Sequence, residues 1–178
     1  INRIQEIKTV LNVIQLSCKV AIKYFGQAKI GMRTYTNTLT GLPNFRGSVK
    51  WFKEFCSIPE NKEKTLTVSV YAMPKYMYIY ENYVIDDLEE AVRFVARTLK
   101  NVNDTKCFVG HINEDTFVIV NYYDDPKDIS DTINRATSIF FSLMNSYNRL
   151  SDKEYYVEVN CGCTMVEPNW KEPLERFI

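Results

Sequence analysis

The chain has 178 residues, with 46% apolar and 13% aromatic side chains, and its 22 Lys and Arg balance 22 Asp and Glu. This composition predicts a folded domain with a hydrophobic core and excludes a disordered tail. The zero net charge removes any global attraction to nucleic acid, so no nucleic-acid partner is expected. No apolar run approaches the roughly 18–20 residues that span a bilayer, so this fragment is not expected to insert directly into a membrane.

The cysteines are odd in number and have apolar neighbours: Cys18, Cys56, Cys107, Cys161 and Cys163. One residue separates the thiols of Cys161 and Cys163, whereas structural zinc sites commonly use two to four, and His111 is the only histidine. We therefore expect no metal and free thiols in a reducing environment, which predicts a cytoplasmic location.

Residues 1–32 are predicted to form a coiled-coil-like connector helix. Apolar residues recur there at alternating spacings of three and four: Ile4, Ile7, Leu11, Ile14, Cys18, Ala21, Phe25 and Ala28. Such a narrow stripe lies either on its own domain or against a second copy, and the second alternative predicts a homodimer. The first residue is Ile rather than Met, so we expect further domains of the same longer chain as partners.

The next segments alternate between helix and strand patterns. Asn44 is a suitable cap for an amphipathic helix whose apolar side carries Val49, Phe52, Phe55 and Cys56. Leu66–Ala72 alternates as a half-buried strand. The aromatic segment Tyr76–Tyr83 follows, with Tyr76, Ile79, Tyr80 and Tyr83 on one helical face, and Leu88–Leu99 has the apolar stripe of a second helix.

The second half continues the alternation. Phe108–Val120 is predicted to form two short strands joined by a polar turn at Asn113-Glu114-Asp115. Asp125 and Pro126 open a helix whose buried face carries Ile129, Ile133, Ala136, Phe140, Leu143 and Tyr147, and Tyr155–Val166 is predicted to be a long strand. The order of elements predicts an α/β (α+β) sandwich, in which helices flank a mixed, mainly antiparallel central sheet.

Two stretches resemble GGDEF domains. Residues 38–46, TLTGLPNFR, resemble the entry motif of that family, D-x-LTGLPNR, although Asn37 and Phe45 depart from it. The predicted hairpin falls where the family has its Gly-Gly-Asp-Glu-Phe signature, and the five positions are here Asn113, Glu114, Asp115, Thr116 and Phe117. The chain is therefore identified as a degenerate GGDEF domain over residues 33–178, without the family's last helix and strand. The resemblance implies the palm-like architecture of nucleotidyl cyclases.

The resemblance also implies which residues of the family's active site are replaced in this chain. Ala72 stands where active members have a metal-binding Asp, and Thr116 stands where they have the signature Glu. Met77 replaces a phosphate-contacting Lys, while Tyr80 and Glu89 replace an Asn and an Asp that read guanine. The implied remnant cleft consists of Ala72, Tyr80, Glu89, Asn113, Glu114, Asp115 and Thr116, with no catalytic residue, no metal and no cofactor. The inhibitory R-x-x-D motif is also missing, because residues 104–107 read Asp-Thr-Lys-Cys.

Three functions are compatible with these departures. The first is a catalytically inactive signalling module of a larger bacterial sensor, acting through dimerisation or domain contact. The second is a receptor that keeps the cleft for a nucleotide or metabolite. The third is a diguanylate cyclase, which would make cyclic di-GMP from GTP and would require the divalent metal that Ala72 and Thr116 no longer favour.

Overall fold

The computed structural model describes residues 35–102, 107–124, 127 and 129–166. The predicted connector helix and the expected cap at Asp125 and Pro126 lie outside these residues. The elements, in chain order, are α2 (Phe45–Ser57), η1 (Pro59–Glu63), β1 (Thr65–Ala72), α3 (Tyr76–Asn82), α4 (Ile85–Val102), β2 (Cys107–Asn113), β3 (Thr116–Tyr123), α5 (Ile129–Leu150) and β4 (Asn160–Val166). None of the described helices is both long and apolar enough to cross a bilayer.

The strands form a single sheet in the order β2-β3-β1-β4. β1 pairs with β3 on one side and β4 on the other, and β2 pairs with β3, in each case antiparallel. The predicted α+β sandwich is thus confirmed, and within the described strands every pairing is antiparallel. The central position of β1 matters for the site, because its last residue, Ala72, faces both Thr116 of β3 and Asn160 of β4.

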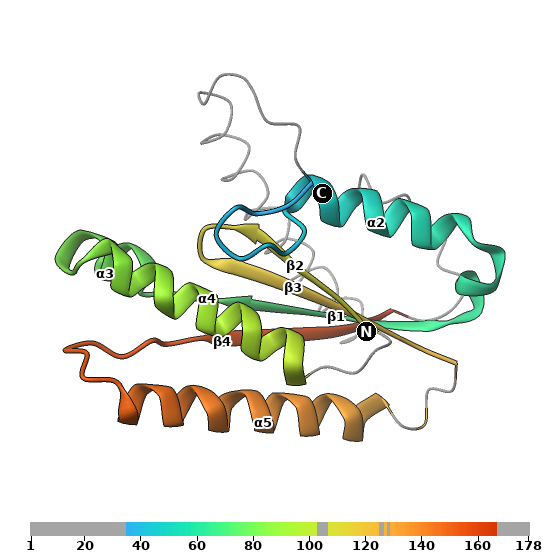
Figure 1. The fold of residues 1–178 in the computed structure, drawn as a ribbon. Coiled ribbons are helices and arrows are strands. Elements are labelled where there is room, and N and C mark those ends of the chain that lie inside the picture. Colours follow the sequence, from blue (N-terminus) through green and yellow to red (C-terminus); the bar gives the residue numbers. More distant parts are fainter. Residues whose placement is uncertain (1–34, 103–106, 125–126, 128, 167–178) are drawn as a thin grey trace, which may run out of the picture.

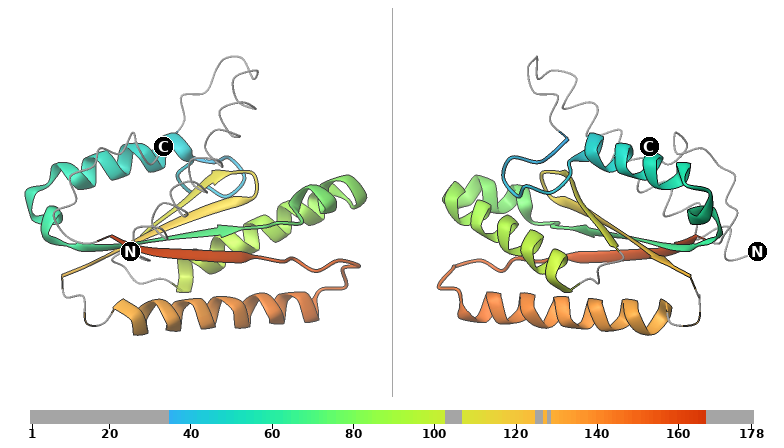
Figure 2. Two further views of the ribbon diagram at one scale, coloured as in Figure 1. Left: turned by 180° about the vertical axis from the view of Figure 1, so that it is seen from behind. Right: turned by 45° about the vertical axis from the view of Figure 1, so that its right-hand side comes forward.

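Helices cover both faces of the sheet (Figures 1 and 2). α4 and α5 pack on one face, and the main core lies between them and the sheet. That core includes Val92, Val95 and Leu99 of α4, Phe140 of α5, and Tyr71, Phe117 and Ile119 of the strands. Successive residues of a strand point to opposite faces, so the odd-numbered residues of β1 and β3 supply this core.

The opposite face carries α2. The Trp51 ring stacks on Phe108 of β2 at 4.2 Å between centroids, and Phe55 contacts Tyr122 of β3 at 5.0 Å. The helix begins as predicted, because the side chain of Asn44 accepts a hydrogen bond from the Gly47 amide at 3.0 Å. The contact between Trp51 and Phe108 was not anticipated, since the sequence pattern assigned the buried side to other residues of this helix.

Three predicted details are wrong in position. In α5, Leu143 is 41% exposed and Met144 is 3% exposed, because the buried stripe continues from Phe140 by four residues rather than three. In α3, the aromatic face was expected to lie mainly in the core, but Ile79 is the one buried residue of this helix and Tyr80 is 49% exposed.

The third detail is the strand predicted over Tyr155–Val166. Tyr155, Val157 and Val159 are buried in alternation, as expected for extended chain. The ladder nevertheless begins only at Asn160, because β1 ends at Ala72 and offers no residue opposite the preceding segment.

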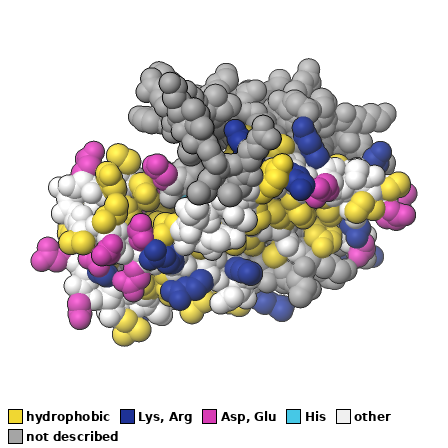
Figure 3. All heavy atoms as spheres, turned by 45° about the horizontal axis from the view of Figure 1, so that its top comes forward, with side chains coloured by type: hydrophobic (Ala, Val, Ile, Leu, Met, Phe, Trp, Pro, Cys, Tyr) yellow, Lys and Arg dark blue, Asp and Glu magenta, His cyan; other side chains and the backbone are white. Residues whose placement is uncertain are grey.

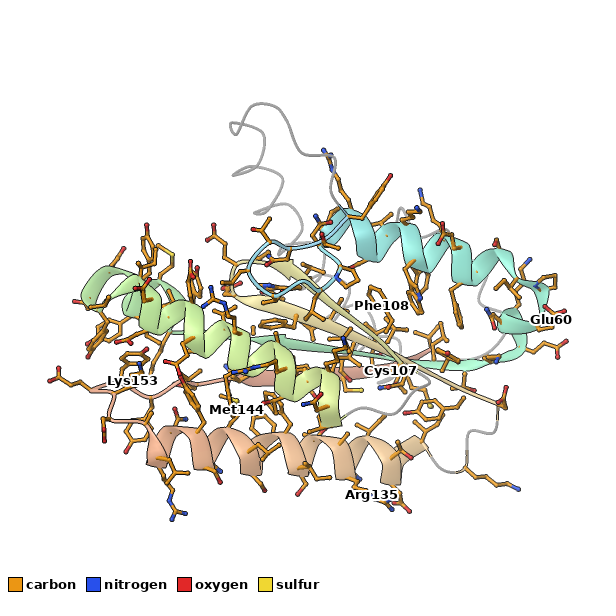
Figure 4. All side chains as sticks on the ribbon, in the orientation of Figure 1. Glu60, Cys107, Phe108, Arg135, Met144 and Lys153 are labelled. Atoms are coloured by element: carbon orange, nitrogen blue, oxygen red, sulfur yellow. The ribbon has the colours of Figure 1, made fainter. Side chains whose placement is uncertain are left out.

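Lys153 attaches the connection after α5 to α4. Its ammonium group is hydrogen-bonded to Asp87 and lies 3.2 Å from the Glu90 carboxylate (Figure 4). Nearby, the Asn148 side chain bonds both the N–H and the C=O of Val157, at 2.8 and 2.9 Å. These contacts fix the segment that leads into β4 next to the start of α4.

Candidate functional site

The hairpin turn between β2 and β3 is the predicted signature position. The Asn113 side-chain oxygen accepts a hydrogen bond from the Asp115 amide at 3.1 Å, which closes an Asx turn around Glu114. The Asp115 carbonyl in turn accepts from the Met73 amide at 2.9 Å. The turn is thereby tied to the segment that follows β1.

The end of β1 brings Ala72 to the same place. Ala72 and Thr116 are direct partners in the β1–β3 ladder. The Thr116 hydroxyl donates to a carboxylate oxygen of Asp115 at 2.6 Å, so one acceptor of that carboxylate is already occupied. Ala72 contributes only a methyl group.

Tyr76, at the start of α3, joins the remaining candidate residues. Burial raises the pKa of its phenol, and the charges of Glu114 and Asp115 raise it further, followed by Tyr80 and Glu89. Tyr80 is half exposed, and the Glu89 carboxylate accepts a hydrogen bond from Arg93 at 2.7 Å.

The structure thus brings five of the predicted site residues together at one end of the sheet, Ala72, Asn113, Glu114, Asp115 and Thr116, while Tyr80 lies on α3 and Glu89 on α4. It adds Tyr76, which the sequence pattern assigned to the aromatic stripe but not to the site. The side-chain donor set is poor for a divalent cation, because Ala72 has no side-chain oxygen and Thr116 offers a neutral hydroxyl that donates to Asp115. Within the residues that the structure describes, no cluster of three His, Cys, Asp or Glu is placed to hold a metal.

A loop from the N-terminal side is docked on this hairpin. The Pro43 carbonyl accepts a hydrogen bond from the His111 amide at 2.8 Å, and Leu42 is buried in the core. Asn37 closes the loop by accepting from the amides of Leu39 and Thr40 at 2.9 and 3.1 Å. The turn itself requires Gly41, whose φ of 70° lies in the left-handed region.

The His111 side chain connects the loop to the turn. Its ring lies on Phe117 at 4.3 Å between centroids, with Nδ1 3.1 Å from the Thr40 hydroxyl and Nε2 3.3 Å from the Glu114 carbonyl. In the neutral ring with the proton on Nε2, Nε2–H donates to the carbonyl and Nδ1 accepts from the hydroxyl. The sequence indicated each stretch separately, and this connection between them was missed, because His111 was considered only as a metal ligand.

We expect stability to fall at acidic pH through His111. Burial lowers its pKa, opposed by the hydrogen bond to the Glu114 carbonyl and by the Asp115 charge. The unfolded chain then binds the proton more readily, so this contribution is fully present above the unfolded pKa of about 6.5 and is lost as the pH falls below it. The measurement is the free energy of unfolding in urea at a series of pH values from about 8 to about 5, a range that spans the unfolded pKa.

The control for this prediction is His111→Phe, which keeps a ring on Phe117 and removes the titrating group. Because carboxylates also titrate in this range, the informative quantity is the difference between the two pH profiles. A variant profile as steep as that of the parent chain would show that His111 does not cause the loss.

Comparison with known proteins was made on sequence and on structure. No protein-family model and no curated protein matches the sequence. In structure, the GGDEF domain of DgcB from Caulobacter crescentus, in complex with c-di-GMP, matches with a TM-score of 0.63. The match covers 80% of this chain and 83% of that chain, at 14% sequence identity. The chain has the GGDEF fold.

Two further solved structures agree with this fold. The coiled coil and GGDEF domain of the same DgcB protein matches with a TM-score of 0.60 at 12% identity, over 95% of this chain and 84% of that one. The GGDEF domain of FimX from Pseudomonas aeruginosa matches with a TM-score of 0.59 at 10% identity, over 78% and 84%. At identities this low, the structural matches show the GGDEF fold and do not show a shared activity.

Proposed function

We propose that this chain is a catalytically inactive GGDEF-fold module of a larger bacterial signalling protein in the cytoplasm, which acts through dimerisation or domain contact. The observation that carries the proposal is the pairing of Ala72 with Thr116 at the end of β1. A methyl group and an engaged hydroxyl stand where the resemblance implies metal-binding carboxylates.

The chemistry of diguanylate synthesis argues in the same direction. Transfer at a phosphorus atom depends on positioning and on cations that neutralise the phosphate charge. At the turn, Glu114 instead adds a negative charge to the position of a signature glycine. At a separation of about 4 Å, its repulsion of a phosphate costs on the order of 1–4 kcal/mol, depending on the effective dielectric. Met77 supplies no compensating cation.

A relay role is supported by the contacts between the N-terminal loop and the hairpin. The path runs from Asn37, which accepts a hydrogen bond from the Thr40 amide at 3.1 Å, through the Thr40 hydroxyl and His111 to the Glu114 carbonyl, at 3.1 and 3.3 Å. A displacement of the segment before Tyr35 would thus reach the turn through directly bonded groups. The proposed homodimer would form through the connector helix of residues 1–32, and the solved GGDEF structures include one with a coiled coil and one of SiaD in complex with its activator SiaC.

A receptor for a nucleotide or another metabolite is the second candidate. It is favoured by the half-exposed ring of Tyr80, which lies near Tyr76 and could stack on a planar ligand. No cofactor is proposed for either function.

The test is calorimetric titration of the 178-residue chain with GTP and with cyclic di-GMP in the presence of magnesium, followed by a turnover assay. We expect no heat at protein concentrations that reveal micromolar binding, and no product. Heat without turnover would replace the relay proposal by the receptor. Turnover that is lost in Asp115→Ala would overturn the proposed inactivity altogether.

A further inference from the structure

A group of large apolar side chains is exposed on and just after α3. Its members, which we call the α3 apolar surface, are Met77, Tyr78, Tyr80, Val84 and Ile85, and each is between 49% and 64% exposed. In Figure 3 hydrophobic side chains gather at the left end of the molecule, where Figure 1 places α3. Single exposed apolar residues are ordinary, but five within nine consecutive positions form a patch of the kind found at interaction sites.

The α3 apolar surface is held in place by aromatic contacts beneath it. Tyr83, which caps the C-terminal end of α3, contacts the buried ring of Tyr155 at 4.6 Å between centroids. Its other neighbour is Tyr78 at 6.2 Å, and Ile79 is fully buried in the core. A short helix anchored in this way presents its exposed side chains with little ordering left to be done on binding.

The surroundings of this surface are acidic. Residues 74–90 contain one Lys and five acidic residues, a net charge of −4 (one minus five) in a chain whose total is zero. Three of the five acids are paired, Glu89 with Arg93 and both Asp87 and Glu90 with Lys153, and Lys75 is held by Glu158 at 2.8 Å. Within the described residues, Glu81 and Asp86 form no ion pair and supply the acidic rim of the surface. Most charged side chains around the apolar group in Figure 3 are accordingly Asp or Glu.

We propose that the α3 apolar surface docks a basic amphipathic helix of a partner protein. Tyrosine and methionine are enriched in the centres of protein interfaces, and a charged rim selects a partner of opposite sign. A helix with an apolar stripe flanked by Lys or Arg matches both features. The same negative rim repels nucleic acid and anionic lipid. The inference rests on the proposed regulatory function, which it deepens by naming the class of partner.

The probe is a synthetic peptide of Leu and Lys, about 18 residues long, arranged to form one apolar stripe in a helix. It is titrated into the isotope-labelled 178-residue chain, and binding is followed by amide shifts and by calorimetry. Because the chain has no net charge, a cationic peptide is attracted only where acidic groups gather. We expect one binding site, with the largest shifts within residues 77–86, and weaker binding as salt is added.

Two matched variants and one matched peptide complete the design. Tyr80→Ser combined with Glu81→Lys should raise the dissociation constant at least about tenfold. Ile139→Ser, which alters a 44% exposed residue on α5, should leave it unchanged. A Leu–Glu peptide with the same spacing should not bind. Unfolding curves of both variants establish that they are folded.

The proposal is overturned if the Leu–Lys peptide does not bind, if it shifts other residues, or if the Leu–Glu peptide binds equally well. It is also overturned if residues 77–86 shift with protein concentration alone, because the occupant is then a second copy of the chain. These outcomes are separable from those of the nucleotide titration. Peptide binding together with cyclase turnover would remove the proposed inactivity and keep the docking site, whereas failure of both ligands to bind would remove only the docking site.

Discussion

Replacing Phe117 by Ala is expected to lower the free energy of unfolding by about 3–5 kcal/mol. The side chain is fully buried, lies in the main core, and stacks on His111. Its removal deletes the packed ring and leaves a cavity at the start of β3, next to the candidate site. Since domains of this size are stable by only about 5–15 kcal/mol, a large part of the total would be lost. Urea unfolding followed by far-UV circular dichroism measures it.

The matched control is Tyr156→Ala, which also removes an aromatic ring but at a position that is 68% exposed. That change should stay within about 0.5 kcal/mol of the parent chain. A loss below about 1 kcal/mol in Phe117→Ala would mean that the core closes around the missing ring, and that β3 is less tightly packed than its burial indicates.

The order of helices and strands could be predicted from the sequence because each element carries its own local pattern. The stripe of α4 and the alternation of β1 depend on residues within one element, and the Asn44 cap depends on its own amide neighbours. The details that were wrong depend on neighbours far away in the chain. The end of β1 decides where β4 begins to pair. The position of α5 over the sheet decides which residues of that helix are buried.

The candidate site shows the same difference between local patterns, which the sequence reports, and contacts between distant parts of the chain. The sequence indicated the turn at Asn113–Asp115 and the strand end at Ala72, and the strand pairing brings the two together. The role of Tyr76 and the path through His111 could not be derived in this way. Each depends on several elements that meet in space, and no spacing in the sequence reports such a meeting.

Replacing Gly47 by Ala is expected to destabilise the chain by roughly 1–3 kcal/mol, although the same change in an exposed helix would stabilise it. A Cβ at Gly47 would lie 2.0 Å from the Tyr35 carbonyl oxygen, which accepts a hydrogen bond from the Asn44 amide. Because the clash is with backbone, the helix and the loop must separate. The loop would then release its bond between Pro43 and His111, so the His111 amide should exchange with solvent faster.

Gly162→Ala is the matched control, because a Cβ at that position meets no atom within 4 Å. This substitution should be neutral or should stabilise the chain by about 0.4–1 kcal/mol, because Ala lowers the conformational entropy of the unfolded chain. Equal effects of the two substitutions would contradict the tight contact between the loop and α2. A loss of stability in Gly47→Ala without faster exchange at His111 would place the strain inside the helix, and the proposed relay through the loop would then lose its structural basis.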